Sequence, residues 1–156
     1  MTDTIHWLLA SPVSQYINEH AWAWPILEIA HFSSLCVLFG CLAPIDLRLA
    51  GLGANIPASL QRGLILGAIA AFVVNATSGG LFFTANATKY IDNPAFELKL
   101  VLIGLAGCNA VIHHWRLQGA ADGVGSSAAA RVVGVLSLLL WSGVIICGRM
   151  ITFYAP

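Results

Sequence analysis

The sequence predicts an all-α protein: a four-helix transmembrane bundle, up-down-up-down, with an N-terminal interfacial helix. Composition is the first reason. Of the 156 residues, 58 % are hydrophobic and 9 % are charged, whereas soluble domains carry about 25 % charged residues. The second reason is four apolar stretches, each long enough to cross the roughly 30 Å hydrocarbon core of a bilayer. Together with short loops they occupy residues 1–156 as one membrane domain.

The spans are expected at about residues 24–48, 63–85, 95–115 and 131–153. The short loops between them make consecutive helices antiparallel. Small residues in the second and third spans predict close helix contacts, because small side chains let backbones approach within a bilayer. Examples are Gly67, Ser78, Gly79, Gly104 and Gly107.

Residues 4–21 read as a helix lying in the membrane interface. Trp7, Tyr16, Trp22 and Trp24 belong to this region or follow it directly, and amphipathic rings are enriched at headgroup level. The segment lacks the basic start and the small-residue cleavage site of a signal peptide.

Lysine and arginine bias predicts the orientation. The first and third loops, with the adjoining span ends, hold Arg48, Arg62, Arg116 and Arg131, whereas the middle loop holds Lys89. Because cytoplasmic loops carry the excess of basic residues, both termini are expected on the periplasmic side of a bacterial inner (cytoplasmic) membrane. The lipid bilayer is thus the expected partner. A net charge of zero and the absence of basic runs exclude nucleic acid.

Ionisable side chains inside the spans predict a polar interior. Counting 1.5 Å per helical residue places four of these residues in one layer, Glu28, His31, Lys99 and Arg149. This layer lies near the side of the bundle on which both termini are expected, called the terminal side below. Charges in hydrocarbon normally face a protein partner, a cofactor or a water-filled cavity. One interpretation is structural, with Glu28 paired to Lys99 or Arg149 and the charges defining helix packing.

The second interpretation is a cofactor site. His31 and Glu28, one turn apart on the same helix, are then ligands to copper or another metal, or His31 is a ligand to a b-type haem. Lys99 belongs to the same cofactor site, and Arg149 holds an anionic group such as a haem propionate. His113 lies about 17 Å deeper than His31 and cannot be the second axial ligand within one chain. His20 could fold back to supply it, or a haem could bridge two copies in a homo-oligomer. A proton or solute pathway through Glu28 and His31 is the third interpretation.

A second set of polar residues is assigned structural roles. Asn75 and Asn109 are expected to hydrogen-bond across helices near the membrane centre. Asp46 and His113 belong to a deeper layer, in which one histidine packs on the aspartate. The chain carries no nucleophile elbow, phosphate-binding glycine loop or nucleotide motif, which leaves enzymatic activity open and disfavours it.

Two runs carry a family resemblance. His31-Phe32-Ser33-Ser34-Leu35, closed by Asp46-Leu47-Arg48-Leu49-Ala50-Gly51, and the third span from Phe96 to His113 resemble an uncharacterised family of small four-helix bacterial inner-membrane proteins. The third span is also loosely similar to copper-resistance D-type membrane domains, which implies periplasmic copper or haem handling. The chain departs from copper transporters in having only Met1 and Met150 as methionines.

The leading functional prediction is therefore a membrane protein with a polar periplasmic-side site that binds a metal or b-type haem. Its role would be electron transfer, with a redox partner, or metal handling. The alternatives are a non-catalytic membrane subunit or scaffold, and a small transporter or proton-relay component.

Overall fold

The computed structural model describes residues 2–53, 56–117 and 128–154, with side chains described for 5–53, 56–112 and 128–154. Within these ranges the chain is helical and contains no strand. In order, the helices are α1 (Thr2–Leu9), α2 (Pro12–Glu19), α3 (Ala23–Leu49), α4 (Ala58–Ala85), α5 (Ala87–Ile91), α6 (Pro94–Leu117) and α7 (Ala128–Met150). The all-α helical bundle predicted from the sequence is confirmed.

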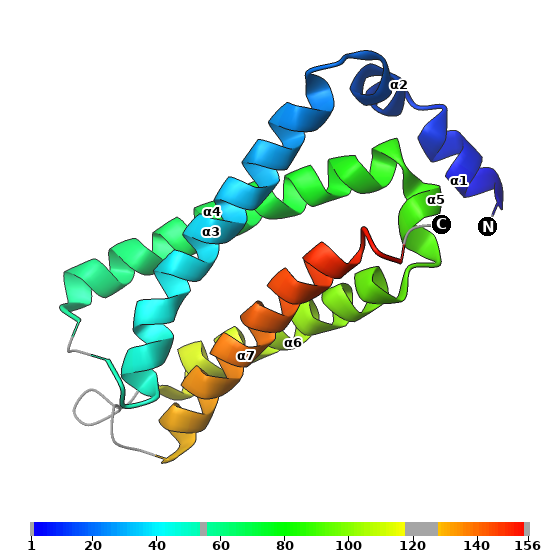
Figure 1. Cartoon of the computed structure of the whole chain (residues 1–156). Helices are drawn as coiled ribbons and strands as arrows, with labels where there is room; N and C mark the ends of the chain where they lie inside the picture. The colour runs from blue at the N-terminus through cyan, green and yellow to red at the C-terminus, as the bar shows by residue number, and fades with distance from the viewer. Residues whose placement is uncertain (1, 54–55, 118–127, 155–156) are drawn as a thin grey trace.

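Helices α3, α4, α6 and α7 are each long and apolar enough to cross a membrane. Their bounds agree with the expected spans to within a few residues at each end. Helix α1 and the C-terminal end of α7 lie at the same end of the bundle, together with α2 and α5 (Figure 1). The protein is therefore a multi-pass membrane protein. Its membrane of residence and the side that faces the periplasm stay predictions.

The four long helices pack in the spatial order α4, α3, α7, α6. Helix α3 packs on both α4 and α7, and α6 packs on α7, whereas α4 and α6 make no substantial contact within the described residues. These two helices are separated in Figure 1, although α5 alone intervenes between them in the chain. The bundle is consequently open along the α4–α6 side.

Small residues allow the close contacts. A Cβ added at Gly134 would lie 2.5 Å from the carbonyl oxygen of Asp46, so glycine is what lets α7 approach α3 there. Added Cβ atoms at Gly67 and Gly79 would touch α3 as well. The prediction of close helix contacts at Gly104 and Gly107 was wrong, because no atom lies within 4 Å of a Cβ built on either glycine. These two glycines lie on parts of α6 that no neighbouring helix covers.

The N-terminal segment, expected as one helix, is divided into α1 and α2. Ser11 lies between them and its hydroxyl accepts a hydrogen bond from the Ser14 N–H, and Pro12 follows in the first turn of α2. Ser and Pro at these positions favour a helix start, so the chain begins a second helix there.

Helix α2 is tied to the end of α4. The Ser14 hydroxyl and the Asn18 side-chain amide both donate to the carbonyl oxygen of Ala85, at 3.4 and 3.0 Å. Ala85 is the last residue of α4, where carbonyl groups lack intrahelical partners. These bonds hold the N-terminal segment over the terminal side of the bundle.

At the opposite end, α3 closes with a Schellman motif. The N–H groups of Leu52 and Gly51 donate to the carbonyls of Leu47 and Arg48, and Gly51 has a φ of 80°. Glycine is favoured in this left-handed conformation because it has no Cβ that would clash with the backbone.

Candidate functional site

The polar site in the terminal half of the bundle centres on His31. This residue lies about 12 Å along α3 from its first residue, counting 1.5 Å per residue, and its side chain is 8 % exposed. A polar ring buried this deeply needs partners for both nitrogens. The site is built around the partners that α4 and α6 supply.

The first partner is Ser78 on α4. The Nδ1 atom of His31 lies 2.9 Å from the Ser78 hydroxyl oxygen, and that hydroxyl also reaches the carbonyl oxygens of Val74 and Asn75 at 2.8 and 3.0 Å. A hydroxyl has one proton to donate. Because the backbone carbonyls take that proton, Ser78 accepts from His31 Nδ1–H. In the neutral ring this leaves the lone pair on Nε2.

The second partner is Lys99 on α6. Its Nζ atom lies 3.5 Å from Nε2 of His31, and the lysine side chain is 9 % exposed. Since Nε2 carries the lone pair, the Lys99 ammonium is the donor. Among the described side chains, no acidic group forms an ion pair with Lys99. A buried lysine therefore faces an imidazole where a carboxylate is the usual partner.

Aromatic and backbone contacts confine the pair. Phe82 of α4 packs edge-to-face on the His31 ring, with centroids 5.5 Å apart, and Trp24 stacks on Phe82. A Cβ added at Gly148 of α7 would lie 3.5 Å from Lys99 Nζ. The lysine thus crosses from α6 to α3 over a glycine, in space that a larger side chain would occupy.

Asn75 fixes α4 against α3 at the same level. Its side-chain amide donates to the His31 carbonyl oxygen at 2.8 Å and reaches the Ser34 hydroxyl at 3.2 Å. The Ser34 hydroxyl donates to that same carbonyl at 2.9 Å. The expected cross-helix hydrogen bond of Asn75 is present, and its acceptor is the backbone of His31.

The other residues of the predicted layer do not join the pair. Glu28 is exposed, and no ion pair links it to Lys99 or Arg149 among the described side chains. The Arg149 guanidinium lies over the Phe153 ring, 5.5 Å from its centroid. His20 stacks on Tyr16 and its Nδ1 lies 2.9 Å from the Tyr16 carbonyl oxygen. Equal depth along the helices had suggested one cluster, but depth does not specify the direction in which each side chain points.

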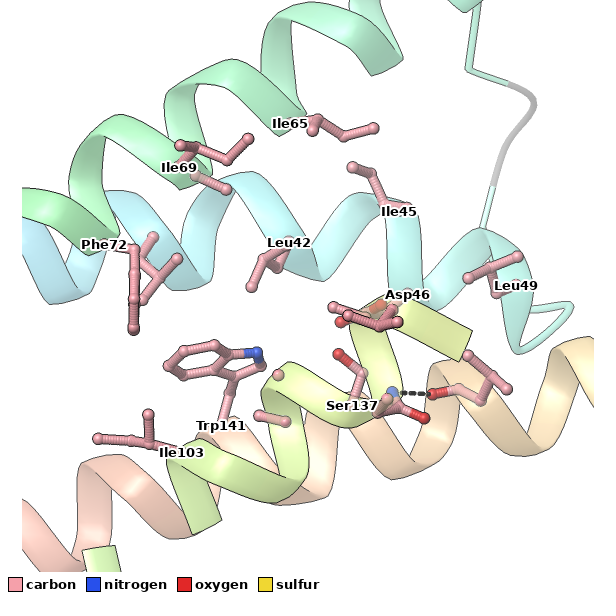
Figure 2. A pocket seen from close by; sticks show the side chains of 18 residues that line it. Leu42, Ile45, Asp46, Leu49, Ile65, Ile69, Phe72, Ile103, Ser137 and Trp141 are labelled. Atoms are coloured by element: carbon pink, nitrogen blue, oxygen red, sulfur yellow. Dashed lines mark hydrogen bonds between the residues drawn. The ribbon is translucent and has the colours of Figure 1, made fainter. Parts of the chain in front are cut away.

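Asp46 and Asn109 lie in the opposite half of the bundle. Asn109 on α6 donates to the Val133 carbonyl of α7 at 3.1 Å, the cross-helix hydrogen bond that the sequence predicted. The Asp46 carboxyl group is buried beside Ser137 of α7 (Figure 2). The predicted packing of one histidine of the deeper layer, His113 or its neighbour His114, on Asp46 falls outside the described side chains.

Metal ligands were predicted at His31 and Glu28. Within the described residues, no group of three or more His, Cys, Asp or Glu side chains is placed to hold a metal ion. The Nε2 atom of His31, whose lone pair would have to bind the metal, faces the Lys99 ammonium. The metal and haem predictions thus gain no support from these residues and stay predictions.

Sequence reasoning missed Ser78, which it had treated as a small packing residue. The available signal was spacing, because Ser78 follows Asn75 by three residues and such residues share a helix face.

Comparison with known protein families, curated proteins and solved structures found no match to this chain.

Proposed function

We propose that the protein is a proton-relay component of the membrane, and that the His31–Lys99 pair exchanges the proton. The observation that carries this proposal is the 3.5 Å approach of Lys99 Nζ to His31 Nε2, with both side chains buried. Ionisable residues inside membrane proteins mark substrate or ion pathways, proton relays and ligand counter-ions.

The pair can hold one proton in two arrangements. In the first, the Lys99 ammonium donates to the neutral His31 ring. In the second, the N–H bond at Nζ breaks, a new N–H bond forms at Nε2, and the positive charge moves onto the imidazolium. Two positive charges at this separation would repel each other strongly in a buried site. The pair therefore stores one proton, which passes between two bases.

Neighbouring groups support the second arrangement. The Ser78 oxygen accepts from Nδ1–H of His31, and an imidazolium also donates from Nδ1, so proton transfer requires no ring rotation. Glu28 lies one turn before His31 on α3, toward the terminal end of the bundle, and is exposed. It is the nearest acidic group along α3, and once protonated its carboxyl group could pass a proton toward the pair.

The proposed setting is a bacterial inner membrane with the pair on the periplasmic side, as the distribution of lysine and arginine indicates. Fusions of a periplasm-dependent enzyme and of a cytoplasm-dependent fluorescent protein to the C-terminus test this setting. Activity of the first fusion alone is expected. Activity of the second alone would place the pair on the cytoplasmic side.

The test of function is proton flux into liposomes that contain the purified protein and a trapped pH-sensitive dye, driven by a potassium diffusion potential. Wild-type protein is expected to pass protons faster than protein-free liposomes. His31→Gln and Lys99→Met are expected to return the flux to that background. Lys89→Met is the matched control, because it removes a lysine of α5 outside the site, and it should retain the flux.

Wild-type flux at the background level, in liposomes shown to contain folded protein, would contradict the proposal. The metal and haem interpretation is the competing one, because a histidine whose Nδ1–H is hydrogen-bonded is also suited to ligate through Nε2. An absorption spectrum and metal analysis of the same preparation distinguish the two. A Soret band or a stoichiometric metal that disappears in His31→Ala would replace the proton proposal with a cofactor site.

A further inference from the structure

A pocket lies in the half of the bundle opposite the His31–Lys99 pair. Its volume is about 420 Å³, within the range of small-molecule sites. Its walls come from α3, α4, α6 and α7, and extend along α3 from Leu38 to Leu49, about 16 Å at 1.5 Å per residue. Figure 2 shows Phe72, Ile103 and Trp141 toward one end of the pocket and Asp46 with Ser137 toward the other.

The pocket exists because α4 and α6 diverge. Ala68 and Phe72 of α4 line one side and Ala106 and Gly107 of α6 the other, yet the two helices make no substantial contact within the described residues. The pocket therefore faces the open side of the bundle, where lipid-soluble molecules have access from the bilayer.

One polar atom in this apolar pocket has no hydrogen-bond partner among the described side chains. The Asp46 side chain is only 6 % exposed. Its Oδ2 atom is buried and makes no hydrogen bond among the described residues. An unsatisfied buried acceptor is costly, and a carboxylate oxygen accepts hydrogen bonds, most strongly from a cationic donor. Among the described residues, the pocket thus combines apolar walls with a carboxylate oxygen that has no protein donor.

We propose that this pocket binds a lipid-soluble molecule with an apolar body and a protonated amine, and that the ammonium donates to Oδ2 of Asp46. The Ser137 hydroxyl, beside the same carboxyl group, orients the acceptor. The apolar body lies between α4 and α6 against Phe72 and Trp141. This proposal does not depend on the proton function of the His31–Lys99 pair.

Three probes that share one apolar body test the ligand class. They are 1-aminomethylpyrene, 1-pyrenemethanol and 1-pyrenecarboxylic acid, whose saturable binding to the full-length protein in phosphatidylcholine nanodiscs is measured against empty nanodiscs. The amine is expected to bind tightest and the alcohol about tenfold more weakly, the effect of one charge-assisted hydrogen bond. The carboxylic acid should bind weakest of the three.

Asp46→Asn should lower the affinity for the amine about tenfold, to the level of the alcohol. Gly107→Leu should abolish binding of all three probes, because its side chain extends from α6 into the pocket. Gly104→Leu is its matched control: it lies on the same helix outside the pocket lining, and neither glycine has an atom within 4 Å of an added Cβ.

The absence of saturable binding, or amine binding that survives Gly107→Leu, would overturn the proposal. So would a preference for the carboxylic acid. The comparison of Gly107→Leu with Gly104→Leu decides the question even if Asp46→Asn does not fold. A repeat in nanodiscs that contain phosphatidylethanolamine identifies the source of the amine. Competition by that lipid would assign the site to a lipid headgroup ammonium, and its absence to a free small molecule.

Discussion

The Nζ atom of Lys99 lies 3.5 Å from Nε2 of His31 and joins α6 to α3, two helices that are otherwise separated by α7 in the packing order. A buried lysine usually faces a carboxylate, but here it faces the lone pair of an imidazole. The tautomer of His31, which Ser78 sets, and the space beside Gly148 that the ammonium occupies both bear on this contact, and each can be tested separately.

The tautomer of His31 is the first prediction. Because Ser78 accepts from Nδ1–H, the neutral ring should carry its proton on Nδ1. Nitrogen NMR of histidine-labelled protein, with His31→Gln to assign the signal, should show this tautomer. Ser78→Ala removes the acceptor and should shift the signal, whereas Thr77→Ala, at an exposed neighbouring hydroxyl, should leave it unchanged. An Nε2–H signal in the wild-type protein would contradict the assignment.

The second prediction concerns the space next to Gly148 that the Lys99 ammonium occupies. A Cβ there would lie 3.5 Å from Lys99 Nζ, which is ordinary contact, so Gly148→Ala should preserve proton flux. Gly148→Leu would place further atoms where the ammonium lies, and flux should fall to that of Lys99→Met. The liposome assay measures both variants. Equal flux in Gly148→Leu and wild type, with equal protein content, would show that the amine position is unimportant.

The third concerns Asn75, which bonds to the His31 carbonyl and to Ser34. Asn75→Ala should lower the free energy of unfolding by about 1 kcal/mol, because hydrogen bonds between membrane helices contribute about 0.6 kcal/mol on average and up to about 1.7. Denaturant titration of detergent-purified protein measures the loss. A double-mutant cycle with Ser34→Ala isolates the bond between these side chains, and a coupling energy of zero would refute its contribution.

The fourth prediction concerns Asn93, which precedes the start of α6. Asn93 is 1 % exposed; its oxygen accepts from the N–H groups of Ala95 and Phe96, and its amide donates to the Ile151 carbonyl. Loss of the helix cap alone costs about 1 kcal/mol, so Asn93→Ala should destabilise by that amount or more. Asp92→Ala, at the exposed preceding residue, is the control in the same unfolding titration and should have little effect.

The fifth is a pH effect at Tyr90, which lies in α5 outside the spans. Burial, and then the negative charge of Glu28, raise the pKa of its hydroxyl above the usual 10.0. A raised pKa means that folding favours the protonated form. The stability from this group is therefore full below pH 10 and is lost as the pH rises through the folded-state pKa.

Ultraviolet titration of wild type minus Tyr90→Phe isolates the ionisation of Tyr90 from that of the other two tyrosines. Its midpoint should lie above 10.0, and Glu28→Gln should move it down, because a nearby negative charge is removed. A midpoint that is unchanged in Glu28→Gln would mean that burial alone sets the value.

The sequence by itself determined the class of the protein, because this depends on quantities that are summed along the chain. Apolar length, scarcity of charge and short loops require membrane-spanning antiparallel helices, and their approximate bounds follow from the same pattern. The break between α1 and α2 could also be read locally, from Ser11 and Pro12. Counting depth along each helix brought His31 and Lys99 to one level.

Only the tertiary structure decided which residues of that level meet. Depth fixes one coordinate of a side chain, whereas a contact also depends on the rotation of each helix and on which helices are neighbours. Glu28 and Arg149 share the depth of the pair but are exposed, while Ser78, assigned only to packing, holds the ring. The pocket beside Asp46 likewise arises from the divergence of α4 and α6, a consequence of three-dimensional packing that no local pattern in the chain encodes.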